Sequence, residues 1–290
     1  MRNRQPEPGV IDKEEQIKKA ELLRALHHAE VPLVLPNIWD AGSAVLAANA
    51  GFPVIATASA SVAWALGRPD GEKLDRGEML EAIARIATRV RLPLTADIES
   101  GYGTTPADVA ETVSKTLKAG AVGINLEDGI SYATGTVFEM PAAIERITAA
   151  RAAAQEAGIN LVINARTDVY FGEQRSIPEK LEEAVARANA YLSAGADCAF
   201  VIAVRDTAAI TELVREIHGP VNIIAGSPTL DINTLARLGV KRISLAGGLA
   251  RNVLGGFKDA LEEIRDNGTT GFLSEGLSHS ELNRLYGDLN

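Results

Sequence analysis

The 290-residue sequence contains a single cysteine, Cys198, and very few aromatic residues. One cysteine excludes an intramolecular disulfide framework and any cysteine-rich metal site, and it fits a reducing cytoplasm. Aromatic residues make up 4% of the chain, against 46% for all hydrophobic residues, so the core must consist mainly of Ala, Val, Ile and Leu. Such a core is usual where helices pack around parallel strands.

The sequence also lacks long apolar runs and an excess of positive charge. No stretch is apolar for long enough to cross a membrane, and the N-terminus has no apolar signal core. The formal net charge of -9 predicts that nucleic acids and acidic membranes are repelled, although local cations could still bind a small anion. We therefore expect a cytoplasmic protein that acts on a small molecule and contacts neither nucleic acid nor membrane.

A recurring phrase organises the chain: a helical pattern ends at Gly, and a short apolar strand follows. It occurs in the segments NAGFPVIATAS, KAGAVGINLED, EAGINLVINART, SAGADCAFVIA and ARLGVKRISLAGG. Glycine is favoured just beyond a helix end because it adopts the left-handed conformation without a Cβ clash. Between these joints, apolar residues recur at spacings of three and four, which is typical of helices. The sequence therefore predicts alternating strands and helices.

The pattern predicts eight strands, each followed by a helix. Their expected ranges are 32–37, 53–59, 92–98, 122–128, 161–167, 198–204, 221–226 and 242–247. Eight parallel units predict a closed (β/α)8 barrel of the TIM type, with a doubly wound open sheet as the alternative. No G-x-G-x-x-G follows the first strand, which argues against a dinucleotide-binding form of that alternative.

We expect the whole chain, residues 1–290, to form one domain with its barrel core at about 31–265. A helix at about Lys13–Ala29, within the N-terminal segment 1–30, precedes the first strand. A weakly helical tail, residues 266–290, follows the barrel. Both ends are expected to decorate the barrel.

Acidic residues gather where the third and fourth predicted strands end. Asp97 and Glu99 lie one residue apart, so in a strand they would share one face. Adjacent barrel strands are close, and Glu127 could therefore join them in an oxygen site for Mg2+ or Mn2+. The alternatives are an exposed loop pair for Asp97 and Glu99, and a helix N-cap for Asp128.

Arg166 and a run of small residues are candidate anion-binding groups. Arg166 follows the fifth strand, where it could bind a carboxylate or phosphonate in bidentate fashion or pair with the acidic residues. Backbone amides of TASAS, residues 57–61, could bind a carboxylate or oxyanion, or the segment could simply pack under a helix. The four histidines are expected on the surface, and Cys198 is expected in the core.

Four ordered motifs resemble those of the isocitrate lyase and phosphoenolpyruvate mutase superfamily. They are PNIWDAGSAVLAANAGFPVIATASASVAWALGRPDGE, LTADIESGYG, INLED and INART, and the resemblance covers about residues 31 to 265. The resemblance implies a barrel whose final helix is exchanged between subunits. It therefore also implies a homodimer or homotetramer.

The resemblance further implies a metal site formed by the acidic residues. Asp97 would coordinate Mg2+, with Mn2+ as a possible substitute. Glu99 and Glu127 would hold the water ligands of the ion. Asp70, in the GRPDGE loop, would approach the same site and share the catalytic work with Glu127.

The substrate-binding residues follow from the same resemblance. Ser59, Ala60 and Ser61 would surround the carboxylate and 2-oxo oxygen of the substrate, beside Asp97. Arg166 would bind the far anionic end and is the third residue given a catalytic role. The implied ligand is a small 2-oxo or 2-hydroxy acid.

The lid predicted at residues 129–141 departs from the lyase pattern. Lyases of this superfamily carry a K-K/R-C-G-H type lid here, whereas DGISYATGTVFEMP contains no Cys, Lys or His. No histidine ends the sixth strand either, which weakens support for phosphoryl migration. The sequence thus favours a Mg2+-dependent carbon-carbon lyase, foremost an oxaloacetate decarboxylase or hydrolase that acts through a metal-bound enolate. The alternatives are weak 2-methylisocitrate or isocitrate lyase activity, a phosphonopyruvate-type or carboxyphosphonoenolpyruvate mutase, and non-catalytic binding of a 2-oxo acid such as 2-oxoglutarate.

Overall fold

The computed structural model describes residues 12–173, 175–226 and 230–287. Nine strands form one parallel sheet in the order β1-β11-β10-β9-β8-β5-β4-β3-β2. Only Pro36 separates β1 (Leu33–Leu35) from β2 (Asn37–Ile38), so this short segment pairs with β11 on one side and with β3 on the other. The sheet is therefore a nearly closed barrel, and the open-sheet alternative is wrong.

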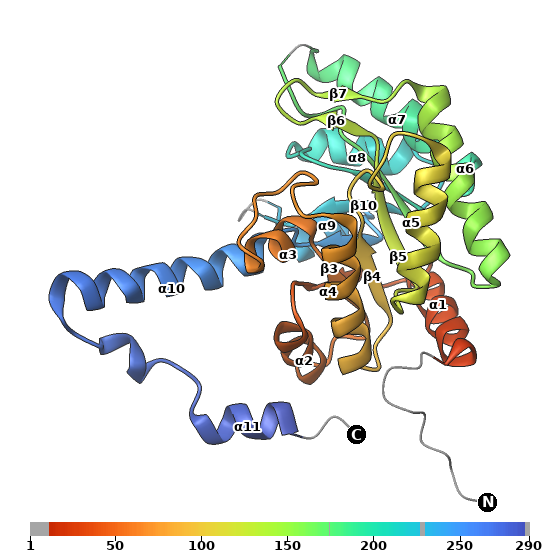
Figure 1. The fold of residues 1–290 in the computed structure, drawn as a ribbon. Helices are drawn as coiled ribbons and strands as arrows, with labels where there is room; N and C mark the ends of the chain where they lie inside the picture. Colours follow the sequence, from red (N-terminus) through yellow and green to blue (C-terminus); the bar gives the residue numbers. More distant parts are fainter. Residues whose placement is uncertain (1–11, 174, 227–229, 288–290) are drawn as a thin grey trace, which may run out of the picture.

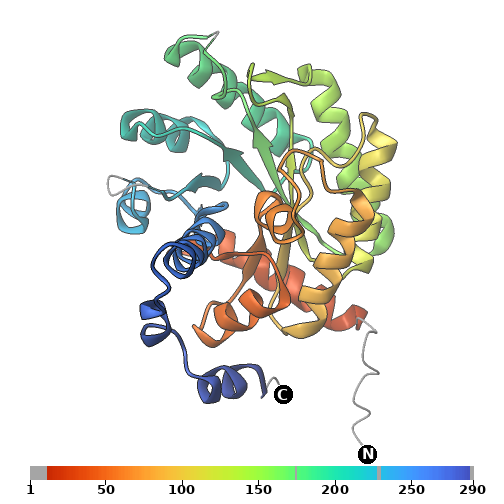
Figure 2. The same cartoon turned by 60° about the vertical axis from the view of Figure 1, so that its left-hand side comes forward.

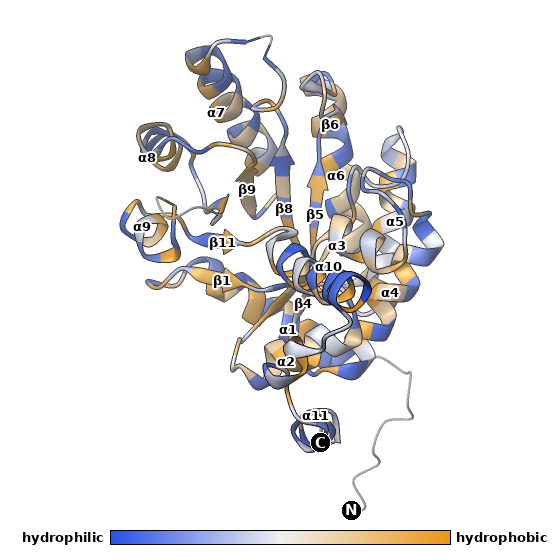
Figure 3. Ribbon diagram, turned by 90° about the vertical axis from the view of Figure 1, so that its left-hand side faces the viewer, coloured by the Kyte–Doolittle hydropathy of each residue, from blue (hydrophilic) through white to orange (hydrophobic). Residues whose placement is uncertain are grey.

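The other barrel strands lie within two or three residues of the predicted ranges. They are β3 (Ile55–Thr57), β4 (Leu94–Asp97), β5 (Gly123–Glu127), β8 (Val162–Thr167), β9 (Cys198–Val201), β10 (Val221–Ile224) and β11 (Arg242–Ser244). Nearly all their side chains are buried, because helices cover the outside of the barrel and side chains fill the inside. Cys198 lies in this core, as predicted. Figure 3 shows the hydrophobic character of β1 and β5.

Helices surround the strands on their outer side (Figure 2). They are α2 (Ala41–Asn49), α3 (Ser59–Ala65), α4 (Arg76–Arg89), α5 (Pro106–Lys118), α6 (Met140–Ala157), α7 (Ile177–Ser193), α8 (Thr207–Glu216) and α9 (Ile232–Arg237). The last helix of the barrel sequence, α10 (Gly248–Asn267), does not lie against the strands along its length (Figure 1). Local sequence sets their starts: the Thr105 side chain accepts from the Asp108 amide, and Pro106 occupies the first turn of α5.

The predicted N-terminal helix, α1 (Lys13–His27), lies across the N-terminal end of the barrel. Leu23 of α1 packs against Gly123, where an added Cβ would lie 2.7 Å from Leu23 Cδ2. This close approach buries His27, which is 1% exposed, so the prediction that all four histidines lie on the surface is wrong for His27. The other three histidines are exposed, as predicted.

Two short strands and the C-terminal segment complete the structure. The strands β6 (Gly129–Ser131) and β7 (Thr136–Val137) form an antiparallel hairpin within the predicted lid. Helix α10 extends away from the barrel, and the chain returns through η1 (Gly271–Ser274) to α11 (His279–Gly287) (Figure 1). The return is fixed to the body, because Arg89 of α4 donates to the Tyr286 carbonyl.

Large apolar side chains of α10 lie exposed along the helix: Leu249, Val253, Leu254, Phe257, Leu261 and Ile264. A folded monomer seldom leaves such a row uncovered. Within the described residues, no helix is both long enough and apolar enough to cross a membrane.

Candidate active site

Two adjoining cavities open where the barrel strands end. We call the first, of about 280 Å3, the central cavity; it is lined by Asn37, Ala58, Ser59, Ala60, Asp70, Asp97, Asn125, Tyr132, Arg166, Phe171, Phe200, Ile202, Ile224, Ser244, Ala246 and Gly247. We call the second, of about 430 Å3, the acidic cleft; it is lined by residues 70–72, 99–100, 127 and 129–133. Asp70 and Tyr132 line both. The carboxyl ends of parallel barrel strands are where such folds place their active sites.

Asp97 ends strand β4 at the wall of the central cavity. Its Oδ2 accepts hydrogen bonds from the Ser59 amide and the Ser59 hydroxyl, each at 3.0 Å. Its Oδ1 is buried and has no hydrogen-bond partner among the described residues. A buried carboxylate oxygen without a donor is costly, so it requires a compensating group.

Glu99 does not share a strand face with Asp97, contrary to the prediction for a strand. Strand β4 ends at Asp97, and Glu99 follows in a turn with a left-handed φ of 52°. The alternative of an exposed loop pair is also wrong, because Glu99 is only 1% exposed and Asp97 only 8%. Burial, followed by the charge of Asp97, raises the pKa of Glu99 to about 8. The two carboxylates are therefore close enough to repel each other.

Glu72, which the sequence reasoning missed, joins two loops beside Glu99. Its Oε1 accepts from the Ser100 hydroxyl at 2.6 Å and from the Tyr102 amide at 3.1 Å. Its own amide donates to Glu99 Oε2. Both Glu72 and Tyr102 also have left-handed φ values, of 55° and 56°. Strained backbone of this kind often occurs at functional sites, and here it holds Glu99 inward.

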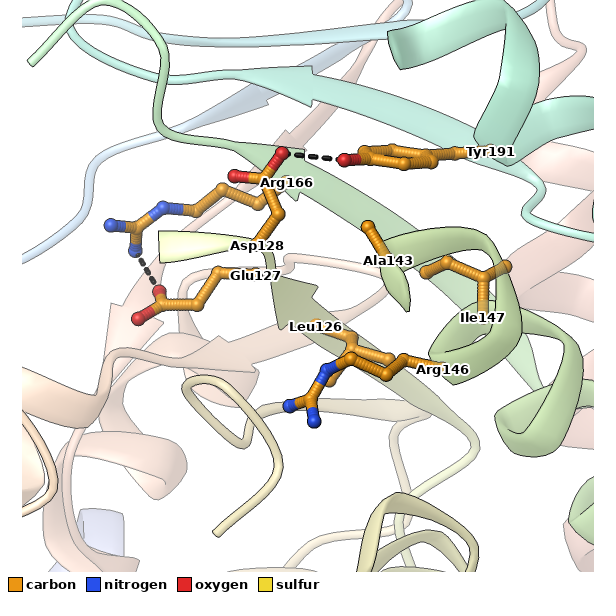
Figure 4. A pocket seen from close by; sticks show the side chains of 8 residues that line it. All are labelled: Leu126, Glu127, Asp128, Ala143, Arg146, Ile147, Arg166 and Tyr191. Atoms are coloured by element: carbon orange, nitrogen blue, oxygen red, sulfur yellow. Dashed lines mark hydrogen bonds and ion pairs between the residues drawn. The ribbon is translucent and has the colours of Figure 1, made fainter. Parts of the chain in front are cut away.

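Arg166, which lines the central cavity, forms an ion pair with Glu127, and Figure 4 shows the two side chains pointing toward each other. Arg166 Nη1 lies 2.6 Å from Glu127 Oε2, while its Nε and Nη2 bind the two oxygens of Asp168 at 2.6 and 2.9 Å. Burial raises the pKa of Glu127, and the Arg166 charge opposes that rise. Arg166 also lines the central cavity, so the structure brings together both predicted roles, pairing with acids and facing the ligand space.

Tyr132 of the lid was also missed by the sequence reasoning. Its hydroxyl donates to Glu127 Oε1 at 2.5 Å, and its ring lies 5.4 Å from the Arg166 guanidinium. The Phe171 and Phe200 rings lie 6.0 and 5.9 Å from the same guanidinium. Aromatic faces attract a cation and exclude water from it. The only sequence signal was a single tyrosine in a lid without other polar aromatic residues.

Asp128 is not a helix N-cap, because strand β6 and not a helix follows it. Its Oδ1 accepts from the Asp168 amide at 2.9 Å, and its Oδ2 accepts from the Tyr191 hydroxyl at 2.5 Å (Figure 4). Burial raises the pKa of Asp128 to about 6. Arg187 lies 3.4 Å from the same Oδ2 and donates to the Phe138 carbonyl at 2.9 Å. Asp128 thus anchors the loops that carry Asp168 and the lid.

Ser59, Ala60 and Ser61, the predicted substrate-binding residues, begin helix α3. The amide and the hydroxyl of Ser59 both donate to Asp97, while Ala60 lines the central cavity. Ser61 is buried and does not line the cavity. The first backbone hydrogen bond of this helix joins the Val62 amide to the Ala58 carbonyl, so the amides before it have no acceptor within the helix. The Ser59 amide donates to Asp97, which leaves the Ala60 amide, beside the cavity, as the candidate donor to a ligand.

Asp70 stands at the mouth shared by both cavities, as the GRPDGE loop was expected to place it. Its side chain is solvent-accessible, yet partial burial, with a contribution from the charge of Asp97, raises its pKa. Four carboxylates of the site, those of Asp70, Asp97, Glu99 and Glu127, thus influence one another.

The donor set fits a hard divalent cation that keeps several water ligands. The unpartnered Asp97 Oδ1 and the neighbouring carboxylates supply oxygen and negative charge, which Mg2+ prefers. Within residues 12–173, 175–226 and 230–287, no three His, Cys, Asp or Glu side chains lie close enough together to surround an ion directly. Water would therefore have to complete the coordination shell.

Comparison with known proteins assigns the family. The sequence profile described as phosphoenolpyruvate phosphomutase matches residues 23–265. The chain belongs to this family. The resemblance to the isocitrate lyase and phosphoenolpyruvate mutase superfamily is thereby confirmed.

Curated relatives of this phosphoenolpyruvate mutase family member include lyases. The chain is 35% identical over 219 residues to an uncharacterized protein of Mycobacterium tuberculosis, covering 76% of this chain and 79% of the relative. It is 31% identical over 205 residues to 2-methylisocitrate lyase of Escherichia coli, covering 68% and 67%. It is 29% identical over 226 residues to oxaloacetate decarboxylase of Ectopseudomonas mendocina, covering 75% and 74%.

Solved structures of the family superimpose closely on the chain. A Burkholderia cenocepacia J2315 protein with the provisional description lyase/mutase is 38% identical, with a TM-score of 0.89 and coverage of 95% of this chain and 98% of that protein. Oxaloacetate acetylhydrolase in complex with the product oxalate is 26% identical, with a TM-score of 0.84 and coverage of 93% and 94%. The barrel and its strand ends are therefore shared with enzymes that act on small organic acids.

Proposed function

We propose that this protein is a Mg2+-dependent carbon-carbon lyase for a small 2-oxo or 2-hydroxy dicarboxylate, and that oxaloacetate decarboxylation is its foremost reaction. The central cavity supports this proposal because it joins a buried, unpartnered carboxylate oxygen of Asp97 to the buried guanidinium of Arg166. One side can hold a metal ion and the other an anion, which matches the two ends of a short dicarboxylate. The relatives that are named lyases and decarboxylases agree with this chemistry.

Four acidic residues would form the metal site in this proposal. Asp97 would hold Mg2+ or Mn2+ directly through Oδ1, while Glu99 and Glu127 would hold water ligands of the ion. Asp70 would approach from the cavity mouth. When bound, the ion would withdraw electron density from the 2-oxo group of the substrate.

The protein's own groups would orient the substrate. Amides at the start of helix α3, beside Ala60, would donate to the carboxylate or 2-oxo oxygen and stabilise negative charge that develops there. Arg166 would donate to the far carboxylate, because Glu127 and Asp168 hold its guanidinium in one plane beside the cavity. Tyr132, Phe171 and Phe200 would keep bulk water from this pair. Asp70, with its raised pKa and solvent access, would carry a proton between the cavity and the solvent.

Pyruvate release from oxaloacetate, measured with Mg2+ and with EDTA, tests this proposal. We expect metal-dependent release by the wild-type protein and its loss in Asp97→Asn. Asp206→Asn, which changes the exposed N-cap of α8, is the matched control and should behave as wild type. Absence of metal-dependent release would reject the decarboxylase assignment. Calorimetry that finds tight binding of oxaloacetate or 2-oxoglutarate without turnover would favour the alternative of a 2-oxo acid binding protein.

We also propose that the protein forms a homodimer or homotetramer through helix α10, in a reducing cytoplasm that keeps Cys198 free. Phe257 and Leu261 expose 61% and 50% of their surface, and a second subunit would cover them. Light scattering should show an oligomer for the wild type and for Lys258→Glu, and a smaller species for Phe257→Glu. A monomeric wild type would contradict the proposal.

A further inference from the structure

A polar layer crosses the interior of the barrel directly below the central cavity. Bulky branched apolar side chains usually fill this position in such barrels. Here the layer contains Thr95, Asn125, Asn164, Asn222 and Arg242, of which none is more than 8% exposed. Asn125 lies at the boundary, because it lines the central cavity and also accepts from Asn164 Nδ2 at 2.8 Å.

Arg242 places a positive charge in this layer. It is the first residue of β11, is 1% exposed, and directs its guanidinium across the barrel. Its Nη2 donates to Asn125 Oδ1 at 3.0 Å and lies 3.4 Å from Thr95 Oγ1. Its Nη1 lies 3.3 Å from His27 Nε2. Among the residues described, no carboxylate pairs with it, and burial lowers its pKa to about 10.

His27 is a neutral partner and does not balance this charge. Its Nδ1 lies 2.7 Å from the Leu23 carbonyl, which assigns the proton to Nδ1 and leaves the Nε2 lone pair facing Arg242. Burial, together with the Arg242 charge, lowers the pKa of His27 to about 3. The arginine is therefore a buried cation with only neutral hydrogen-bond partners, which is an expensive arrangement unless a more distant negative charge compensates it.

The nearest compensating charges lie one layer above, in the site. Asn125 pairs in register with Asp97, and Thr95 lies two residues before Asp97 on the same strand. Two residues of strand span about 7 Å, so a guanidinium that contacts both Thr95 and Asn125 lies on the order of 7 Å from Asp97. At such a distance, in the interior of a protein, one unit charge changes a binding constant for another by roughly 10- to 50-fold.

We propose that Arg242 is a positioning residue that holds Asn125 at the floor of the central cavity and, through its own charge, favours the anionic acid there and disfavours the free metal ion. The inference rests on the proposed metal site at Asp97. If Arg242 acts in this way, the metal ion binds weakly on its own. The acid binds tightly once the ion is present, so metal does not saturate the site in the absence of substrate.

Two binding measurements test the proposal, because removing the Arg242 charge should change the affinities for the metal ion and for the acid in opposite directions. Mn2+ affinity is measured by electron paramagnetic resonance, and oxalate affinity for the Mn2+-loaded protein by calorimetry. In Arg242→Met we expect Mn2+ to bind at least tenfold more tightly and oxalate at least tenfold more weakly. Arg242→Lys keeps the charge and should retain both affinities within about threefold. A loss of packing alone would weaken both ligands together.

Arg24→Met is the matched control on the same end of the barrel. Arg24 of α1 is a cation paired with Asp197, and its Nη2 donates to Asn160 Oδ1 at 2.7 Å, so its removal should change neither affinity. Shifts of the same sign in Arg242→Met, or equal behaviour of the Met and Lys variants, would overturn the Arg242 proposal and leave the metal site intact. A wild-type protein that binds no Mn2+ would overturn both proposals.

Discussion

The buried His27 should make the protein lose stability in mild acid. Its pKa is lowered to about 3 from an ordinary 6.5, first by burial and then by the charges of Arg242, His28 and Arg24. As the pH falls, the unfolded chain therefore takes up a proton on this residue before the folded protein does. The stability that depends on neutral His27 is complete above about pH 6.5 and is lost progressively toward pH 3.

The size of the effect follows from this difference. Each pH unit between the two pKa values changes the free energy of unfolding by about 1.4 kcal/mol. Between pH 7 and pH 4.5, His27 should lower the free energy of unfolding by about 2.5 kcal/mol. The range from pH 7 to pH 6.5 contributes little, because it lies above the ordinary pKa of histidine. That is a substantial fraction of the 5 to 15 kcal/mol typical of folded proteins.

Urea unfolding of the wild type and of His27→Gln, at pH 7 and pH 4.5 and at one protein concentration, measures this effect. Glutamine does not titrate but can still accept a hydrogen bond from Arg242. The wild type should lose about 2.5 kcal/mol more than the variant between the two pH values. His28→Gln, at an exposed neighbouring position, should lose as much as the wild type. Equal losses in the wild type and His27→Gln would refute the reasoning.

Three further predictions concern the site itself. Asp97→Asn should weaken Mn2+ binding at least tenfold, because it neutralises the carboxylate with the unpartnered oxygen; an unchanged affinity by paramagnetic resonance would contradict this. Arg166→Met should lower the free energy of unfolding in urea by about 3 to 5 kcal/mol, because the buried Glu127 and Asp168 carboxylates lose their cationic partner. A decrease below about 1 kcal/mol would argue against these ion pairs. Tyr132→Phe should lower kcat/KM for oxaloacetate by about tenfold and cost about 1 to 3 kcal/mol in urea unfolding, because the buried Glu127 loses the hydrogen bond from this hydroxyl; wild-type kinetics would count against a role for the lid.

Much of the fold was predictable because local signals agreed with the global arrangement. Apolar strands followed helices that end at Gly, and this repeat fixed the strands of the barrel to within a few residues. The acids at the ends of β4 and β5 were found for the same reason, since parallel barrel strands bring their carboxyl ends together. Asp97 and Glu127 are accordingly where the strand ends place them.

Other features depend on contacts that local sequence does not encode. The alternation of a strand predicted that Glu99 shares a face with Asp97. In the structure Glu99 instead lies in a left-handed turn, and the Glu72 amide from another loop donates to its carboxylate. His27 was expected on the surface because nothing in α1 shows that the helix closes the barrel end. Arg242 is the first residue of the short strand Arg242–Ser244, and only the barrel structure reveals that its side chain points inward.

Diffraction from crystals grown with MnCl2 and oxalate, recorded for the anomalous signal of manganese, tests the central claim most directly. The account predicts a manganese peak in the central cavity beside Asp97 Oδ1, with oxalate on the ion and Glu99 and Glu127 reaching it through water. A crystal in which the cavity holds oxalate without manganese, or in which manganese lies away from Asp97, would contradict it.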